Sequence, residues 1–430
     1  MPGPGQNPIS ILYSLFTNPI YAGIISGVGG EPGRPRRRKD LEDESVGSFL
    51  NRRLEGSTVA DNVASAVLHG IYAGDIYKLS IRSLLPSLWY MEGMYGSLAV
   101  GLTALSWGKK FLMSHQDMQL SSSLSDSLDT RLLYKMSNAS VYTFKAGIST
   151  LSAMLEDRLK ANPNVTFKMN SKLSSIEHDV QSDQITVHLF SLQLCSPTYA
   201  NNHKIKTSSK LPPATYTRVI STIPGRTLST LTTTPLTSLA SIHSVTVMVV
   251  NLFFAQPGLL PQRGFGYLIP RSVPFHQNPE RALGVIFDSD AVPDQDSIAG
   301  TKVTVMIGGH WWDDFENFPT GEEGVAMARA VLKRHLGVDA EPILSKATLQ
   351  RDCIPQYTVG HEARMKRAHG ELRNAFGGKL AVAGNSYTGV GLNDCVRAAR
   401  DVVMEVKKGK DVTGLEGFTS PRVWAMVSRM

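Results

Sequence analysis

Leu380-Ala381-Val382-Ala383-Gly384-Asn385 predicts a short buried strand that ends at a glycine, and Tyr387-Thr388-Gly389-Val390-Gly391-Leu392 leads from it into a helix that continues to about Val406. A strand, a glycine-rich turn and a helix in this order present backbone N–H groups and a helix dipole to an anion or a reduced flavin. An ordinary strand-to-helix connection, in which the glycines only serve the turn, explains the same residues equally well.

The chain before this unit predicts further strands and a helix. Four strands are expected at 245–254, 266–269, 283–287 and 303–307, and their spacing is typical of an antiparallel sheet. Thr320 and Gly337 predict the two ends of a helix over 322–336. Another strand is expected at 165–169.

The first third of the chain predicts mainly helices over 44–108 and a flexible, serine-rich insert over 114–130. Residues 23–30 are rich in glycine but form no clean GxGxxG, so a flexible turn is favoured over a phosphate site. The basic run 34–39 is followed at once by acidic residues. A solvated loop is favoured there, with a nuclear signal or a phosphate patch as the alternative.

The composition excludes several classes of protein. The chain has 430 residues, 42% of them hydrophobic, and a net charge of +7, which excludes a disordered chain. Cys195, Cys353 and Cys395 lie far apart, so a disulfide scaffold and zinc ribbons are excluded. No apolar run reaches the roughly 20 residues of a membrane-spanning helix. The histidines lack the spacing of metal ligands, and GxSxG and GxxxxGK[ST] motifs are absent, so neither a metal nor a serine nucleophile is expected.

Segments spread over nearly the whole chain carry a family resemblance: residues 43–49, 72–75, 78–80, 144–147, 264–270, 303–309, 354–357 and 383–391. Together and in this order they resemble the protoporphyrinogen oxidase family of the fungal mitochondrial type, within the monoamine-oxidase-like flavoproteins. The family opens with a βαβ unit carrying GxGxxG and a later acidic residue, and this chain has neither. We therefore expect an N-terminally truncated chain that binds FAD weakly or not at all. It would lack the pyrophosphate-binding helix, an import signal and the family's substrate-carboxylate arginine.

The resemblance implies an α/β (mixed α+β) fold with three parts: an incomplete FAD-binding Rossmann-like domain, an antiparallel-sheet substrate domain and a helical membrane-binding domain. We expect residues 1–140 to form the helical membrane-binding and substrate-lid region, including the serine-rich insert. Residues 141–225 and 377–430 are expected to be segments of the FAD domain. Residues 226–376 are expected to be the substrate-binding domain.

The resemblance also assigns residues to FAD and to the substrate. The positions implied for FAD are Leu173, Leu349, Gly384, Asn385, Val390, Gly391 and Leu392. The positions implied for a tetrapyrrole substrate are Gly70, Leu268, Ile286 and Met306. Periodicity alone favours plain sheet core for the last three, and only the resemblance assigns them to the substrate. No catalytic side chain and no metal are implied, because hydride passes directly to the flavin.

The implied activity is FAD-dependent oxidation of protoporphyrinogen IX to protoporphyrin IX with dioxygen as acceptor, a step of haem biosynthesis. The resemblance further implies a monotopic homodimer on the mitochondrial inner membrane, without nucleic acid as a partner. One alternative is another amine-oxidase-like or desaturase-like flavoenzyme, against which Met306 and the segment 354–357 argue. The other alternative is an inactive fragment that binds no FAD.

Overall fold

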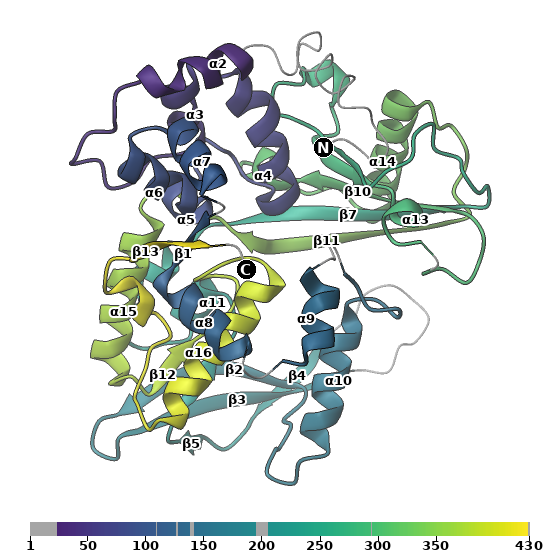
Figure 1. Ribbon diagram of the computed structural model, residues 1–430. Coiled ribbons are helices and arrows are strands. Elements are labelled where there is room, and N and C mark those ends of the chain that lie inside the picture. The colour runs from purple at the N-terminus through teal and green to yellow at the C-terminus, as the bar shows by residue number, and fades with distance from the viewer. Residues whose placement is uncertain are drawn as a thin grey trace. The chain divides into compact units, whose positions relative to one another are not determined.

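The computed structural model describes residues 24–108, 110–125, 128–137, 142–194, 205–293 and 295–428 (Figure 1). The chain divides into two compact units, which are described one at a time. Unit 1 comprises Met1–Thr143, Ser244–His361 and Arg422–Met430, and unit 2 comprises Phe144–His243 and Glu362–Pro421. The expected mixture of helices and sheets is confirmed, whereas the division at residues 140, 225 and 376 stays a prediction.

A five-stranded antiparallel sheet forms the centre of unit 1. Its strand order is β11-β7-β10-β9-β8, and every neighbouring pair is antiparallel. The strands are β7 (Ser244–Phe254), β8 (Gly266–Leu268), β9 (Ala282–Ile286), β10 (Thr301–Gly308) and β11 (Leu344–Pro355). The four strands predicted between residues 244 and 309 are therefore confirmed, and Figure 1 shows β7 and β11 as the two longest arrows of this sheet.

Helix α14 (Gly321–Leu336) packs on one face of this sheet. The hydroxyl of Thr320 accepts from the N–H of Glu323 at 3.3 Å, and the Glu323 carboxylate accepts from the N–H of Thr320 at 2.7 Å. Gly337 ends the helix with φ of +67°, a conformation that glycine adopts without steric cost. Both predicted helix ends are thus confirmed. The core below the helix is apolar and includes Val305, Ile307 and Val331.

The other helices of unit 1 surround a second apolar core that includes Phe49, Leu79 and Trp89. Its polar centre is Arg53, a fully buried residue that forms an ion pair with the equally buried Glu31. These elements are α2 (Ile24–Gly30), η2 (Glu31–Gly33), α3 (Val46–Leu54), η3 (Val59–Ala64), α4 (Ser65–Tyr72), α5 (Ile81–Leu84), α6 (Pro86–Tyr95), α7 (Leu98–Trp107), α8 (His115–Ser125) and α9 (Thr130–Ser137). Helix α8 replaces most of the expected flexible insert. At its start the hydroxyl of Ser114 donates to the carboxylate of Asp117 at 2.5 Å and accepts from the N–H of Asp117 at 3.1 Å.

Three short elements and a strand pair complete unit 1. The short elements are η4 (Phe275–Gln277), α13 (Asp288–Ala291) and η5 (Gly309–Trp312). Strand β1 (Lys110–Ser114) pairs antiparallel with β13 (Trp424–Ser428), which comes from the last part of the chain.

Unit 2 contains an antiparallel sheet and a separate parallel strand pair. The sheet has the order β2-β3-β4, with β5 also on β3, and the pair is β6 with β12. Its strands are β2 (Ser171–Asp179), β3 (Gln184–Leu194), β4 (Ile205–Lys210), β5 (Ala214–Tyr216), β6 (Val219–Ser221) and β12 (Leu380–Val382). Its helices are α10 (Ser149–Lys160), α11 (Gly225–Ser229), α12 (Thr237–Ala240), α15 (His361–Phe376), α16 (Leu392–Lys407) and η6 (Glu416–Phe418).

The strand expected at 165–169 is wrong. This segment is irregular, and the strand begins instead at Ser171, after Asn170 turns the backbone with φ of +53°. Asparagine tolerates this left-handed conformation better than most residues.

Candidate substrate and cofactor sites

One face of the sheet in unit 1 carries the three apolar residues assigned to the substrate. Gly284 of β9 lies opposite both Leu268 of β8 and Met306 of β10. Ile286 lies two residues farther along β9. Directly paired residues, and residues two apart on one strand, project from the same face of a sheet. The structure therefore brings Leu268, Ile286 and Met306 together on one face.

Gly70 of helix α4 approaches the same face. A Cβ atom added at Gly70 would lie 2.8 Å from Cδ2 of Leu268, and one added at Gly284 would also lie 2.8 Å from that atom. Glycines at both positions therefore leave room for the Leu268 side chain, which remains 39% exposed. An exposed leucine on a sheet face is suited to bind an apolar ligand.

Leu349 lies elsewhere in unit 1. It pairs with Met248 and packs against the core under α14, on the opposite face of the sheet from Met306. Its side chain is therefore not part of the face formed by Leu268, Ile286 and Met306. The other six positions assigned to FAD belong to unit 2.

The turn between β12 and α16 is the candidate flavin site of unit 2. Gly384 has φ of +126°, and a Cβ atom at Gly389 would lie 2.3 Å from Cγ of Asp394, so both positions favour glycine. The Asp394 carboxylate accepts from the N–H of Gly391 at 3.2 Å. The first turn of α16 leaves other backbone N–H groups without partners inside the helix, and Gly391 and Leu392 are exposed.

This turn fits a flavin. Exposed N–H groups at the start of a 16-residue helix favour negative charge, which a reduced flavin ring carries. Gly384, Asn385, Val390, Gly391 and Leu392 all lie between the end of β12 and the first turn of α16. Leu173 lies on β2 and packs against the core of unit 2 that contains Val382 and Tyr387.

Sequence reasoning missed a pair of histidines in unit 1. Nδ1 of His69 lies 2.7 Å from the carbonyl oxygen of Ile269, so this nitrogen carries the proton. Nε2 of neutral His69 then accepts from Nε2–H of His310 at 3.0 Å. Burial lowers the pKa of both rings, and His310 also faces His69, which helps to lower its pKa to about 4. The two residues are 241 positions apart, so no local pattern predicts the pair.

A second missed cluster centres on Arg271. Its guanidinium forms a 2.7 Å ion pair with Asp75 and lies 4.6 Å from the ring centre of Tyr77. Its backbone N–H donates to the hydroxyl of Ser65 at 3.0 Å. These contacts hold the segment after β8 against helix α4, which contains Gly70.

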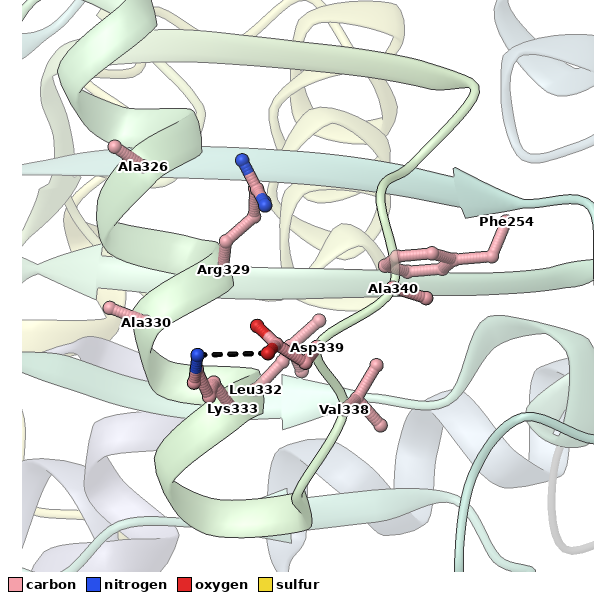
Figure 2. Close-up of a pocket in the computed structure, with 9 residues that line it drawn as sticks. All are labelled: Phe254, Ala326, Arg329, Ala330, Leu332, Lys333, Val338, Asp339 and Ala340. Carbon is pink, nitrogen blue, oxygen red and sulfur yellow. Dashed lines mark hydrogen bonds and ion pairs between the residues drawn. The ribbon is translucent and has the colours of Figure 1, made fainter.

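A pocket of about 260 Å³ lies on the α14 side of unit 1, and Figure 2 shows the residues that line it. It is lined by Phe254, Ala326, Arg329, Ala330, Leu332, Lys333, Val338, Asp339 and Ala340. Lys333 and Asp339 form an ion pair of 2.9 Å across it. None of the residues assigned to FAD or substrate lines this pocket, and Phe254 belongs to the core face of the sheet.

The two cysteines in the described ranges have unreactive thiols. Burial raises the pKa of Cys353, and burial together with Asp394 raises that of Cys395. Both thiols are therefore protonated at neutral pH, whereas a nucleophilic cysteine needs a lowered pKa. Cys195 lies outside the described residues.

Neither a metal cluster nor a membrane-spanning helix is found in the described part of the chain. No group of three His, Cys, Asp or Glu side chains there is placed to hold a metal ion. No helix there is long and apolar enough to cross a bilayer.

A match to a family model identifies the class of the chain as a flavoprotein. Residues 30–407 match the model of the flavin-containing amine oxidoreductases, and the chain belongs to this family. The expected family and its cofactor, FAD, are confirmed.

Two curated relatives are protoporphyrinogen oxidases. The protein from Schizosaccharomyces pombe is 32% identical over 394 residues, which cover 90% of this chain and 74% of that protein. The protein from Homo sapiens is 30% identical over 405 residues, which cover 91% of this chain and 73% of that protein. A crystal structure from Exiguobacterium, described as a putative protoporphyrinogen oxidase, shares the fold with a TM-score of 0.65 and 20% identity, covering 90% of this chain and 72% of that one.

Proposed function

We propose that this chain is an oxidoreductase that converts protoporphyrinogen IX to protoporphyrin IX with FAD as its cofactor, a step of haem biosynthesis. The observation that carries the proposal is the identity of 32% and 30% to two protoporphyrinogen oxidases over nine tenths of the chain. Bound FAD supplies the acceptor of two electrons in each oxidation step.

The chain's own residues bind and orient the reactants in this proposal. The face formed by Leu268, Ile286 and Met306, with Gly70 beside it, binds the apolar macrocycle of the substrate. The turn from Gly384 to Leu392 holds the flavin ring. No side chain is assigned a proton transfer, since positioning alone contributes a large part of the rate in such a reaction.

Dioxygen as acceptor, a homodimer and a place on the mitochondrial inner membrane are further parts of the proposal. Exposed apolar side chains on the helices of unit 1 support contact with a membrane surface. They are Val67 and Ile71 of α4, Met94 of α6, and Val100 and Leu102 of α7, each at least 46% exposed.

The test is an aerobic assay of the purified chain with protoporphyrinogen IX. With FAD supplied in the assay, protoporphyrin fluorescence should rise with the amount of protein. If the chain oxidised simple amines but not protoporphyrinogen IX, this result would contradict the proposal and favour another amine-oxidase-like enzyme. A chain without flavin or turnover, even after incubation with FAD, would favour the inactive fragment.

A further inference from the structure

Arg281 lies at the edge of the face assigned to the substrate. It directly precedes β9, and the pairing of β9 with β10 shifts by one residue between Met306 and Ile307. The shift places Leu283 on the face opposite the α14 core. The guanidinium of Arg281 lies beside Trp311, which packs against the same cluster as Leu283. Arg281 lies three residues before Gly284 in the chain.

The backbone of Arg281 is held in an unusual conformation. Its φ is +59°, which L-residues other than asparagine and aspartate rarely adopt. The side chain of Asn278 fixes the turn with two hydrogen bonds of 2.9 Å, both to the backbone of Ala282. The N–H of Gly308 donates to the Arg281 carbonyl oxygen at 3.0 Å. Such conformations persist where surrounding contacts enforce them, and they concentrate at functional sites.

The guanidinium of Arg281 is positioned by aromatic rings. It lies 4.6 Å from the ring centre of Phe275 and 5.1 Å from that of Trp311. In the described part of the chain, no carboxylate forms an ion pair with it. The carboxylate of the neighbouring Glu280 accepts two hydrogen bonds from the guanidinium of Arg334, at 2.5 and 2.8 Å.

Trp311 connects Arg281 to the candidate substrate face. Trp311 and Met306 pack against the same apolar cluster, which contains Val245, Val247 and Leu283. The indole Nε1 of Trp311 is buried and has no hydrogen-bond partner among the described residues. An unpaired cation and an unpaired N–H donor thus lie together at one edge of an apolar face.

We propose that Arg281 binds a carboxylate of the tetrapyrrole at this edge, an assignment that rests on the proposed function. A guanidinium offers five N–H donors in a plane that matches a carboxylate with two parallel hydrogen bonds. The rings of Phe275 and Trp311 hold that plane in place before the ligand arrives. Arg271 cannot take this role, because Asp75 already neutralises it at 2.7 Å.

The test compares protoporphyrin IX with its dimethyl ester, which keeps the macrocycle and removes both negative charges. Binding of each to the full chain is measured by fluorescence titration for the wild type, Arg281→Ala and Arg281→Lys. The control is Arg351→Ala, since Arg351 also lies over an aromatic ring, at 4.9 Å from that of Phe318. Circular dichroism is recorded for every variant.

Arg281→Ala should weaken binding of the diacid about tenfold, as expected for the loss of a charged hydrogen bond, and leave binding of the ester unchanged. Arg281→Lys should give an intermediate loss, and Arg351→Ala none. Equal weakening of diacid and ester, or no weakening of either, would overturn the assignment of Arg281 while the proposed function stands. A wild-type chain that binds neither compound would overturn both.

Discussion

Gly391 has an ordinary backbone conformation, with φ of −75°, so a larger residue strains no dihedral angle there. A Cβ atom at Gly391 would lie 3.1 Å from Oδ2 of Asp394, so that side chain would have to shift slightly. Gly391→Val should still leave the fold intact, at a cost of about 1 kcal/mol as an N-cap change. The added side chain would cover the exposed start of α16, where we place the flavin. After incubation with FAD, we expect at least several-fold less bound flavin in the variant than in the wild type, measured by absorbance, with unchanged circular dichroism.

A control at another helix start is Gly321→Val. Gly321 is the first residue of α14, and a Cβ atom there would meet no other atom within 4 Å. This variant should keep its flavin. Full flavin loading and normal turnover of Gly391→Val would contradict the assignment of the turn.

His310 should make the stability of the chain depend on pH. Its pKa of about 4 in the folded state lies below its ordinary value of 6.5, so the unfolded chain binds more protons between these two values. The contribution of His310 to the free energy of unfolding therefore rises with pH across this window. This contribution is lost as the pH falls from about 6.5 towards 4. By pH 5 the loss should be on the order of 2 kcal/mol.

Urea unfolding of the wild type and of His310→Gln, at a series of pH values, measures this dependence. Asp75, Arg271, Asp313 and His69 face His310 and are present in both proteins. The variant should show a flatter profile between pH 5 and 7. A control, His276→Gln in the exposed η4, should keep the wild-type slope; equal slopes in all three proteins would refute the prediction.

The site could be predicted from sequence only where the chemistry is local. Gly384 to Leu392 form one continuous turn, and Leu268 and Met306 each lie in a segment that resembles the family. The sequence did not predict the contact between His69 and His310. It also did not predict the contact between Arg281 and Trp311. Their partners are distant in sequence, or depend on a register shift between two strands that no pattern of residues reveals.

At the scale of the element, adjacent residues of strand β10 lie on opposite faces of the sheet, one in the core and one on the face assigned to the substrate. Ile307 is fully buried in the core under α14, while the adjacent Met306 belongs to the opposite face. Ile307→Ala should lower the free energy of unfolding by about 2–5 kcal/mol. Met306→Ala should cost less, because a partly open face leaves no sealed cavity, and should instead raise the Michaelis constant for protoporphyrinogen IX.

The measurement pairs chemical denaturation with steady-state kinetics on both variants. Leu268→Ala, on the same face as Met306, serves as a second substrate-side variant. If Met306→Ala and Leu268→Ala destabilise the chain as strongly as Ile307→Ala, with unchanged Michaelis constants, the face is ordinary core and the substrate assignment is wrong.

Elements with complete local signals were predicted correctly. Helix α14 carries a capping threonine, a glutamate three residues later and a terminal glycine, all within its own sequence. The segment 165–169 has the β-branched and aromatic residues of a strand, but no neighbouring strand pairs with it. Helix α8 forms in a serine-rich segment because one side-chain cap, from Ser114, offsets the weak helix propensity of serine.

At the scale of the whole molecule, the chain passes between the two units four times. Unit 1 therefore depends on residues 422–430, which supply β13 as the partner of β1. Trp424 of β13 also contacts Tyr90, with ring centres 5.1 Å apart. Removing residues 422–430 should expose β1 and lower the stability of unit 1 by about 2–4 kcal/mol.

Hydrogen exchange followed by mass spectrometry can check this prediction. Protection should fall in β1 and α7 of unit 1 and remain in β2 and β3 of unit 2. Val423→Ala is the control, because Val423 is 67% exposed and its carbonyl oxygen still accepts from His115 at 2.9 Å. Unchanged protection of β1 after the truncation would show that β13 does not stabilise this unit.

The pairing of β1 with β13 also sets an order of events during translation. Strand β1 leaves the ribosome early, yet its partner is synthesised after every other described strand. Unit 2 can complete its sheet while β1 still presents unpaired N–H and C=O groups, which attract other strands. A nascent chain that stalls after residue 421 would carry this open edge, so chaperones should bind it preferentially at β1, and release should follow the synthesis of β13.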